Sequence, residues 1–308
     1  MLSLFRIVEA IVVLGCAAFL ISKSTTSEQR NKYLPQKLPA LKNRTLGFER
    51  LIVVSAGTQW RINGLRKAAQ FSGIDFDIPA QPNWSENEVD RFRGIHDASR
   101  KSKIGPGQTR AWLGHLNAIQ DMITRGESTA LFMEDDVDWD IAIKQQLDRV
   151  APLIRQVSGS RPVIKNQSSP YGDAWDMLWL GHCYDRIPYV IPASYIDDTL
   201  PDSPAYFEND GTYTNFPQYL RMVYMSETPA CMYAYALTAA SARRVHALAK
   251  GGMDKDISFH FMKWCRAGIL RCVTVNPELF HQHKQAGERS SEVAVLQGWQ
   301  NKSLLRSV

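Results

Sequence analysis

Apolar residues gather in five short runs along this chain, and longer polar or mixed stretches separate them. Runs of this length that are rich in Leu, Ile, Val and aromatic side chains are typical of buried β-strands. Because segments with helical spacing lie between them, the pattern predicts an α/β fold. The predicted strands are Leu51–Ser55, Thr129–Met133, Asp176–Leu180, Met232–Leu237 and Leu270–Val275.

The segment that leads into the second of these strands is the clearest α/β unit. Gly105–Gly107 predicts a loop, and Thr109 is expected to cap the helix that follows it. A short turn at Gly126 then joins the helix to the strand. The helix is marked by apolar residues at helical spacing, which are Ala111, Leu116, Ile119 and Ile123.

Three consecutive carboxylates, Glu134, Asp135 and Asp136, follow the same strand. Charges crowded at a strand end repel one another, and a hard divalent cation with oxygen ligands relieves that repulsion. Ligands of open α/β sheets also bind outside the carboxyl ends of the strands. The acidic run therefore predicts a metal that holds a phosphate-bearing substrate. The alternative is an acidic turn, with Asp138 or Asp140 capping the next helix.

The helix before the acidic run carries Gly114 and His115, and the strand begins about a dozen residues later. This arrangement resembles the shared block of glycosyltransferase family 25, which contains lipopolysaccharide and collagen galactosyltransferases. That block consists of a Gly-containing loop, a helix carrying Ser-His, and an apolar strand that ends in Glu-Asp-Asp. Here Gly114 replaces the Ser, while His115 and the acidic run keep the order and spacing of the family.

The resemblance extends on both sides of this block, from about Leu51 to Ser291. It includes a strand that turns into a helix, for which Thr238 is the expected N-cap. It is interrupted at Trp84–Ser102 and Asp185–Tyr219, where the chain departs from the family pattern. The other matching segments are Arg61 with Leu65, Gly73-Ile74-Asp75, Trp175–Gly181, Asp254–Ile257 and the residues from Pro277 to Ser290.

The resemblance implies a fold, a reaction and a cofactor. The fold is a GT-A-like α/β/α sandwich with a mainly parallel central sheet. The reaction is the metal-dependent transfer of a hexose, with galactose favoured, from a UDP-hexose to a glycan or protein acceptor. Mn²⁺ or Mg²⁺ is the expected cofactor, since a divalent cation positions the donor diphosphate and offsets its developing charge.

The expected metal ligands are Asp136 with Glu134 or Asp135, as the resemblance implies. A further ligand often comes from a C-terminal histidine in this fold, and in a strand-like stretch His281 and His283 would point to the same side. The alternative is that both are surface histidines. The residues expected to bind the donor are Ser55, Arg61 and Asp135.

A general base for the acceptor hydroxyl is expected at the start of a helix near residue 257. Asp254 and Asp256 are the candidates, and Asp254 fits the family spacing better. Both residues are equally compatible with a role as helix-start caps without chemistry. His115 is assigned a catalytic role by its place in the motif, and the alternative is a buried core histidine.

The N-terminal segment Leu2–Ser22 is apolar except for Arg6 and Glu9, and about twenty helical residues span a bilayer core. We expect a single-pass anchor, with a cleaved signal peptide as the alternative. Localisation in the Golgi or endoplasmic reticulum membrane follows, with the catalytic domain in the lumen. The predicted divisions are a signal-anchor at 1–22, a stem at 23–45 and the glycosyltransferase domain at 46–308.

Glycosylation sequons and cysteines support entry into the secretory pathway. Sequons begin at Asn43, Asn83, Asn166 and Asn301. Outside the apolar segment the chain has four cysteines, which allow three connectivities of two disulfides. Because two of them are close in sequence, the preferred connectivity is Cys265–Cys272 with Cys183–Cys231.

The composition fits one enzyme domain. The formal net charge of +5 is mild, and the chain contains neither a nucleic-acid-binding motif nor a Walker loop. Two other function classes remain open. One is a metal-dependent phosphohydrolase, which usually needs acidic residues from several strands and a second metal. The other is a catalytically silent lumenal binding protein of the same fold. The acceptor is not determined by any motif.

Overall fold

A seven-stranded mixed sheet forms the centre of the residues that the computed structural model describes, which are 43–94, 104–160, 169–183, 185–200 and 219–283. These residues belong to a unit that spans 41–308. The predicted anchor, residues 1–22, lies outside them, as does the predicted stem up to residue 42. Within the described ranges no helix combines the length and the apolar character that a membrane span requires.

The strands of this sheet follow the spatial order β1-β2-β7-β4-β8-β6-β5. Their bounds are β1 Arg50–Val54, β2 Thr129–Glu134, β4 Met177–Gly181, β5 Ala193–Ile196, β6 Leu220–Met225, β7 Ala234–Thr238 and β8 Cys272–Asn276. Neighbours β1 and β2 are parallel, as are β4 and β8, and the other neighbouring pairs are antiparallel. As a result β1, β2, β4, β5 and β8 run in one direction, and β6 and β7 run in the other.

All five predicted strands are present, and none of their ends moves by more than two residues. The α/β class and the largely parallel strand direction are therefore confirmed. The predicted strand that became β7 runs antiparallel between β2 and β4. Strands β5 and β6 were not predicted. One reason is that β5 alternates half-buried and exposed residues at the edge of the sheet, so it lacks a continuous apolar run.

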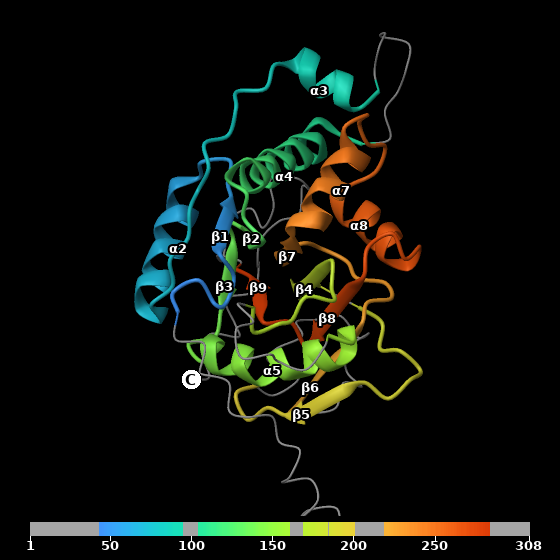
Figure 1. Cartoon of the computed structure of the whole chain (residues 1–308). Coiled ribbons are helices and arrows are strands. Elements are labelled where there is room, and N and C mark those ends of the chain that lie inside the picture. The colour runs from blue at the N-terminus through green and yellow to red at the C-terminus, as the bar shows by residue number, and fades with distance from the viewer. Residues whose placement is uncertain (1–42, 95–103, 161–168, 184, 201–218, 284–308) are drawn as a thin grey trace, which may run out of the picture. The chain divides into compact units, whose positions relative to one another are not determined.

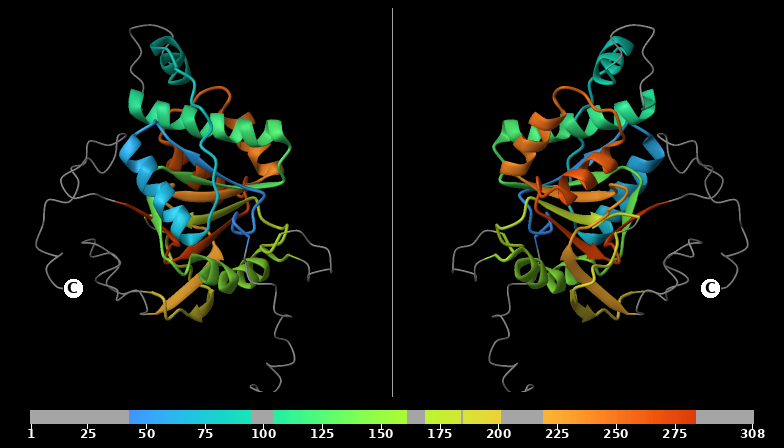
Figure 2. Two further views of the ribbon diagram at one scale, coloured as in Figure 1. Left: turned by 90° about the vertical axis from the view of Figure 1, so that its left-hand side faces the viewer. Right: turned by 90° about the vertical axis from the view of Figure 1, so that its right-hand side faces the viewer.

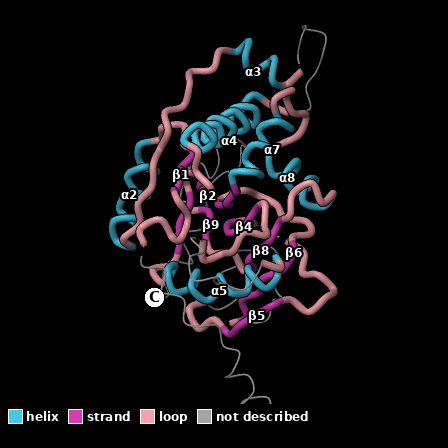
Figure 3. Tube along the Cα trace, viewed as in Figure 1, coloured by secondary structure: helices cyan, strands magenta, loops and turns pink. Residues whose placement is uncertain are grey.

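Helices cover both faces of the sheet, as Figures 1 and 2 show, with α4, α7 and α8 on one face and α5 on the other. Figure 3 shows the same layers coloured by secondary structure. The short helix α3 packs against α4. The bounds are α2 Gln59–Ser72, α3 Glu86–Phe92, α4 Pro106–Arg125, α5 Ile143–Ser158, α7 Ala239–Ala249 and α8 Ile257–Arg266.

The alternation of side chains along the strands divides the core in two. Leu131 and Met133 of β2 pack in a cluster with residues of α2 and α5. Ala130 and Phe132 of the same strand pack in a second cluster with residues of α4, α7 and α8. Because successive residues of a strand point to opposite faces, one apolar run supplies both clusters. This burial on both faces explains why the central strands are apolar throughout.

Helix ends agree with the sequence prediction at one position and differ at another. Thr238 caps α7 and accepts a hydrogen bond from the backbone N–H of Ser241, as predicted. The prediction that Thr109 caps α4 is wrong, because the helix begins at Pro106 with Gly105 as its N-cap. Thr109 lies inside the first turn, where its hydroxyl donates to the carbonyl of Gly105. Proline suits the first helical position, since it has no N–H to leave unpaired there.

A second, two-stranded sheet joins the chain after β2 to the C-terminal part of the described residues. Strand β3, Val137–Trp139, pairs antiparallel with β9, Phe280–Gln282. In this register Val137 faces Gln282 and Asp138 faces His281. The pairing places residues 280–282 beside the acidic run that precedes β3.

Two disulfides join Cys183 to Cys231 and Cys265 to Cys272, which is the predicted connectivity. Disulfides of this kind form in oxidising compartments, so they fit a secreted or lumenal protein. Of the four sequons, those at Asn43 and Asn83 lie in the described residues, and both asparagines are exposed. The sequons at Asn166 and Asn301 lie outside the described residues.

Candidate functional site

The acidic run lies where β1 and β2 end together. Because these strands are parallel and in register, Ser55 after β1 comes beside Asp135 after β2. The Ser55 hydroxyl donates a 2.5 Å hydrogen bond to Oδ2 of Asp135 and accepts one from the backbone N–H of Gly57. Asp135 is buried, and this contact fixes one of its carboxylate oxygens.

Arg61, in the first turns of α2, supplies a positive charge to the same place. Its Nη1 lies 3.2 Å from Oδ1 of Asp135 and 3.6 Å from Oδ2 of Asp136. The guanidinium is buried, and its Nε has no hydrogen-bond partner among the described residues. Two adjacent carboxylates thus share one arginine, which offsets only part of their charge.

Asp136 is held from the opposite side by β9. The side-chain amide of Gln282 donates to Oδ2 of Asp136 over 3.2 Å, and the backbone N–H of His283 donates to its carbonyl. Burial, and then the charge of Glu134, raise the pKa of the Asp136 carboxyl to about 7, although Arg61 and Gln282 oppose that shift. The carboxyl therefore holds its proton to a higher pH than an ordinary aspartate does.

Glu134, the last residue of β2, meets His115 of α4. Nε2 of His115 lies 3.7 Å from Oε1 of Glu134, and Nδ1 lies 2.9 Å from the hydroxyl of Tyr235. Burial, followed by the charge of Glu134, raises the pKa of Tyr235 well above its usual value, so the phenol keeps its proton. His115 is thus buried in the core, as one interpretation of the sequence held, and it also lies beside the acidic run. A catalytic role for it stays a prediction.

The close approach of α4 to β1 gives a structural reason for a glycine at position 114. A Cβ atom built on this glycine would lie 3.2 Å from Cγ1 of Val54, the last residue of β1. Such a contact is tighter than usual and requires a neighbour to move. The glycine therefore lets the helix that carries His115 lie close to the strand that leads to Ser55.

The two predicted histidine ligands lie near the acidic run but pair elsewhere. Nδ1 of His281 lies 3.2 Å from Glu278, and Nδ1 of His283 lies 3.8 Å from Asp138. The residue between them, Gln282, contacts Asp136 instead. In the part of the chain that the structure describes, no group of three or more His, Cys, Asp and Glu side chains is arranged to hold a metal ion.

A metal at the acidic run would therefore take few ligands from the chain. Mg²⁺ typically keeps several waters and uses one or two carboxylates together with substrate phosphates. Asp136, with Glu134 beside it, fits that pattern, since both supply carboxylate oxygens. Burial disfavours the ionised form of Asp136, and the charge of Arg61 offsets this effect only in part. Asp135 is already engaged by Ser55 and Arg61.

The predicted general-base candidates lie at the start of α8. Asp256 is the N-cap of this helix and accepts a hydrogen bond from the backbone N–H of Phe259. Asp254 is exposed, and one of its oxygens lies 3.2 Å from Nε2 of His260. Burial lowers the pKa of His260, and Asp254 partly opposes that shift. The capping alternative thus describes Asp256, while Asp254 presents an accessible carboxylate.

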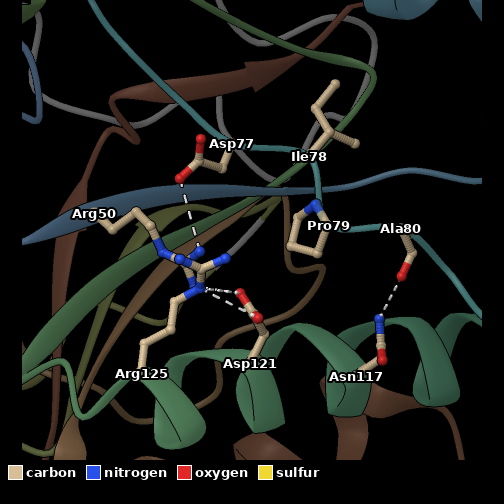
Figure 4. A pocket seen from close by; sticks show the side chains of 8 residues that line it. All are labelled: Arg50, Asp77, Ile78, Pro79, Ala80, Asn117, Asp121 and Arg125. Carbon is tan, nitrogen blue, oxygen red and sulfur yellow. Dashed lines mark hydrogen bonds and ion pairs between the residues drawn. The ribbon is translucent and has the colours of Figure 1, made fainter.

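A pocket of about 560 Å³ opens at the other end of β1. Figure 4 shows that Arg50 and Arg125 meet Asp121 and that Arg50 also faces Asp77. Arg50 lies at the start of β1, whereas Ser55 follows its end. This pocket and the acidic run therefore lie at opposite ends of β1. The pocket is lined by Arg50, Asp77, Ile78, Pro79, Ala80, Asn117, Asp121 and Arg125.

Sequence reasoning missed two residues that contact the predicted site. Gln282 is overlooked because two histidines flank it and histidine is the commoner metal ligand. In the sequence, Tyr235 is one of several apolar residues of a predicted strand. In the structure, its hydroxyl faces His115. Both residues lie in segments that resemble the family, and no role was assigned to either. Both contacts depend on strands that are distant in sequence.

Comparison with protein-family models finds no match to this chain, and comparison with curated proteins finds none that is significant. The case for a function thus depends on the residues and their geometry.

Proposed function

We propose that this protein is a metal-dependent glycosyltransferase with a GT-A-like fold. It moves a hexose, with galactose favoured, from a UDP-hexose to a glycan or protein acceptor. Mn²⁺ or Mg²⁺ is the proposed cofactor, and no nucleic acid is involved. The observation that carries the proposal is the buried carboxyl of Asp136 at the carboxyl edge of the parallel pair β1 and β2, next to Glu134 and Asp135.

The electrostatics of the acidic run support binding of a divalent cation. The pKa of Asp136 is raised because burial and Glu134 both disfavour its ionised form. A cation supplies the positive charge that Arg61 alone provides only in part, so the carboxyl ionises when the cation binds. Asp136 and Glu134 would hold the metal, and Gln282 would keep the Asp136 carboxylate in place through its hydrogen bond.

Arg61 and the start of α2 support binding of the donor diphosphate. The Nε of Arg61 is buried without a hydrogen-bond partner in the described chain, so it has a donor to offer to a phosphate oxygen. The first turn of α2 contains no acidic residue, so the helix itself places no negative side chain at the positive end of its dipole. Ser55 binds one oxygen of Asp135, and the other oxygen accepts a hydrogen bond from Arg61. These contacts hold Arg61 near the carboxyl ends of β1 and β2.

The remaining roles are assigned to His115, Tyr235 and Asp254. When bound, the metal offsets the charge that develops on the leaving diphosphate. His115 orients Glu134, and the hydroxyl of Tyr235 fixes the ring of His115. Asp254 is the proposed base for the acceptor hydroxyl, since its carboxylate is exposed whereas Asp256 caps α8.

The compartment is proposed on two grounds. The disulfides fit an oxidising environment, and two exposed sequon asparagines are accessible to glycosylation. We propose that residues 1–22 anchor the protein in the Golgi or endoplasmic reticulum membrane as a single-pass signal-anchor. The domain from residue 46 onward is then lumenal.

The test compares Asp136→Asn with wild type in a calorimetric titration of UDP in the presence of Mn²⁺. The substitution keeps the size of the side chain and removes its charge, so we expect the fold to persist and Mn²⁺-dependent UDP affinity to fall at least tenfold. The matched control is Asp138→Asn. Asp138 is two residues away and half exposed, and its carboxylate faces His283.

Equal affinities for wild type and Asp136→Asn would contradict the metal assignment. Mn²⁺-dependent hydrolysis of nucleotide sugars by wild type separates a transferase from a silent binding protein of the same fold. Cleavage of simple phosphoesters, without turnover of nucleotide sugars, would favour the phosphohydrolase alternative.

A further inference from the structure

Trp60 is an exposed aromatic residue at the edge of the sheet where the acidic run lies. It occupies the first turn of α2, and 37 % of its surface is accessible. The other tryptophans in the described part of the chain are buried or half-buried. Single exposed aromatic rings are common on protein surfaces, so what distinguishes Trp60 is the charged group beside it.

Arg61 links this ring to the acidic run. Its Cζ lies 5.4 Å from the centroid of the Trp60 ring, within the range of a cation–π interaction. The Nη1 of the same guanidinium lies 3.2 Å from Asp135. Arg61 therefore stands between a flat aromatic surface and the carboxylates. The carboxylates and Arg61 supply charge, and the ring of Trp60 supplies a surface for stacking.

The backbone before Trp60 is open. Gly57 has a φ of 94°, and a Cβ atom built on it would meet nothing within 4 Å. Together with the first turn of α2, which carries no acidic residue, this loop leaves room for a ligand to approach from the carboxyl edge. Trp60 and Arg61, both in the first turn of α2, follow this loop in the chain.

We propose that Trp60 stacks against the base of a nucleoside diphosphate whose phosphates lie at Arg61 and the acidic run. This inference rests on the proposed function and names the residue that holds the base of its nucleotide-sugar donor. Every base has a flat π-face, so stacking on Trp60 contributes affinity without choosing the base. A lipid phosphate has no ring for this surface.

The experiment measures the affinities of UDP and inorganic pyrophosphate, each with Mn²⁺, for wild type, Trp60→Ala and Trp60→Phe. Removal of one base-stacking partner is expected to raise the Kd of UDP by about 5- to 100-fold. Pyrophosphate, which has no base, should bind equally to all three proteins. Trp60→Phe should retain most of the UDP affinity because it keeps an aromatic face.

The control substitution is Phe71→Ala, near the other end of α2. Phe71 is 76 % exposed, so its loss removes an exposed aromatic ring from the same helix without affecting the site. Its UDP affinity should match that of wild type. Melting curves of all variants verify that α2 remains folded.

The outcomes distinguish this inference from the proposed function. Equal UDP affinities for wild type and Trp60→Ala, with Mn²⁺-dependent binding retained, would overturn the stacking assignment alone. An equal loss of UDP and pyrophosphate affinity in Trp60→Ala would overturn it as well, because the ring would then act only by holding Arg61. Failure of wild type to bind either ligand with Mn²⁺ would overturn the proposed function itself.

Discussion

The side-chain amide of Gln282 donates a hydrogen bond of 3.2 Å to Oδ2 of Asp136, across a separation of 146 residues. The contact exists because β9 pairs with β3, which begins directly after Asp136. Together with Arg61, it makes a neutral amide a side-chain partner of the carboxylate that the sequence predicts as the chief metal ligand.

Replacement of Gln282 should disturb the acidic run more than replacement of either neighbouring histidine. Gln282→Ala removes a hydrogen bond that lowers the pKa of Asp136. Hydrogen bonds to charged groups contribute about 1.5 to 3 kcal/mol, so Mn²⁺-dependent UDP affinity should fall about tenfold or more. His281→Ala is the matched control, since His281 pairs with Glu278. A larger loss of Mn²⁺ affinity in His281→Ala would favour the histidine ligand that the sequence suggested.

The stability of the metal-free protein should depend on the protonation of Asp136. Its pKa is about 7 in the folded protein and near 3.8 in the unfolded chain. Between these values the folded state binds more protons, so the free energy of unfolding should fall as pH rises from about 4 to about 7. The contribution of this group is at most about 4 kcal/mol. Urea unfolding in EDTA at pH 5 and pH 7.5 measures it.

Asp136→Asn serves as the reference for this pH dependence, since it cannot titrate at this position. Its loss of stability between the two pH values should be smaller than that of wild type, and other groups contribute equally to both proteins. Mn²⁺ should stabilise wild type more at pH 7.5 than at pH 5, because protons and metal compete for the carboxylate. Parallel pH profiles for the two proteins would contradict the raised pKa.

The ion pair between Arg221 and Asp197 should be a major support of the fold near β9. Both side chains are almost fully buried, with Nε of Arg221 2.6 Å from Oδ2 of Asp197. Arg221 also donates to the carbonyls of Pro277 and Glu278, which lead into β9. Removal of one partner from a buried pair costs about 3 to 5 kcal/mol, so Arg221→Met should lower the free energy of unfolding by that amount.

The control for this prediction is Arg44→Met. Arg44 pairs with the exposed carboxylate of Asp75, and such surface pairs contribute about 0 to 1 kcal/mol. Denaturant midpoints of both variants measure the difference. Equal losses of stability would mean that the buried ion pair of Arg221 contributes no more to the free energy of unfolding than a surface pair does.

The two disulfides should differ in their contribution to stability. The Cys183–Cys231 bond closes a separation of 48 residues, and Cys265–Cys272 closes one of 7. Chain entropy alone then predicts a loss of about 4 kcal/mol for the double alanine variant of the first pair and about 2 kcal/mol for the second. Denaturant unfolding of the two double variants tests this order, and a reversed order would contradict the entropic account.

Much of the fold follows from local sequence patterns. The central strands were predicted to within two residues because each is buried on both faces and must be apolar throughout. The cap at Thr238 was predicted because its hydrogen bond reaches only three residues along the chain. The acidic run was found because its three carboxylates are adjacent in the sequence.

The tertiary structure decided how residues from distant segments contact that run. Ser55 and Arg61, which the sequence prediction had grouped with Asp135, contact it where β1 lies parallel to β2, whereas Gln282, to which no role was assigned, contacts Asp136 because β9 pairs with β3. Tyr235 meets His115 because β7 runs antiparallel beside β2. The register between distant strands depends on packing summed over the whole core, and no short stretch of sequence records it. The sequence by itself therefore identified the charges at the strand end, whereas the tertiary structure determined which side chains contact them.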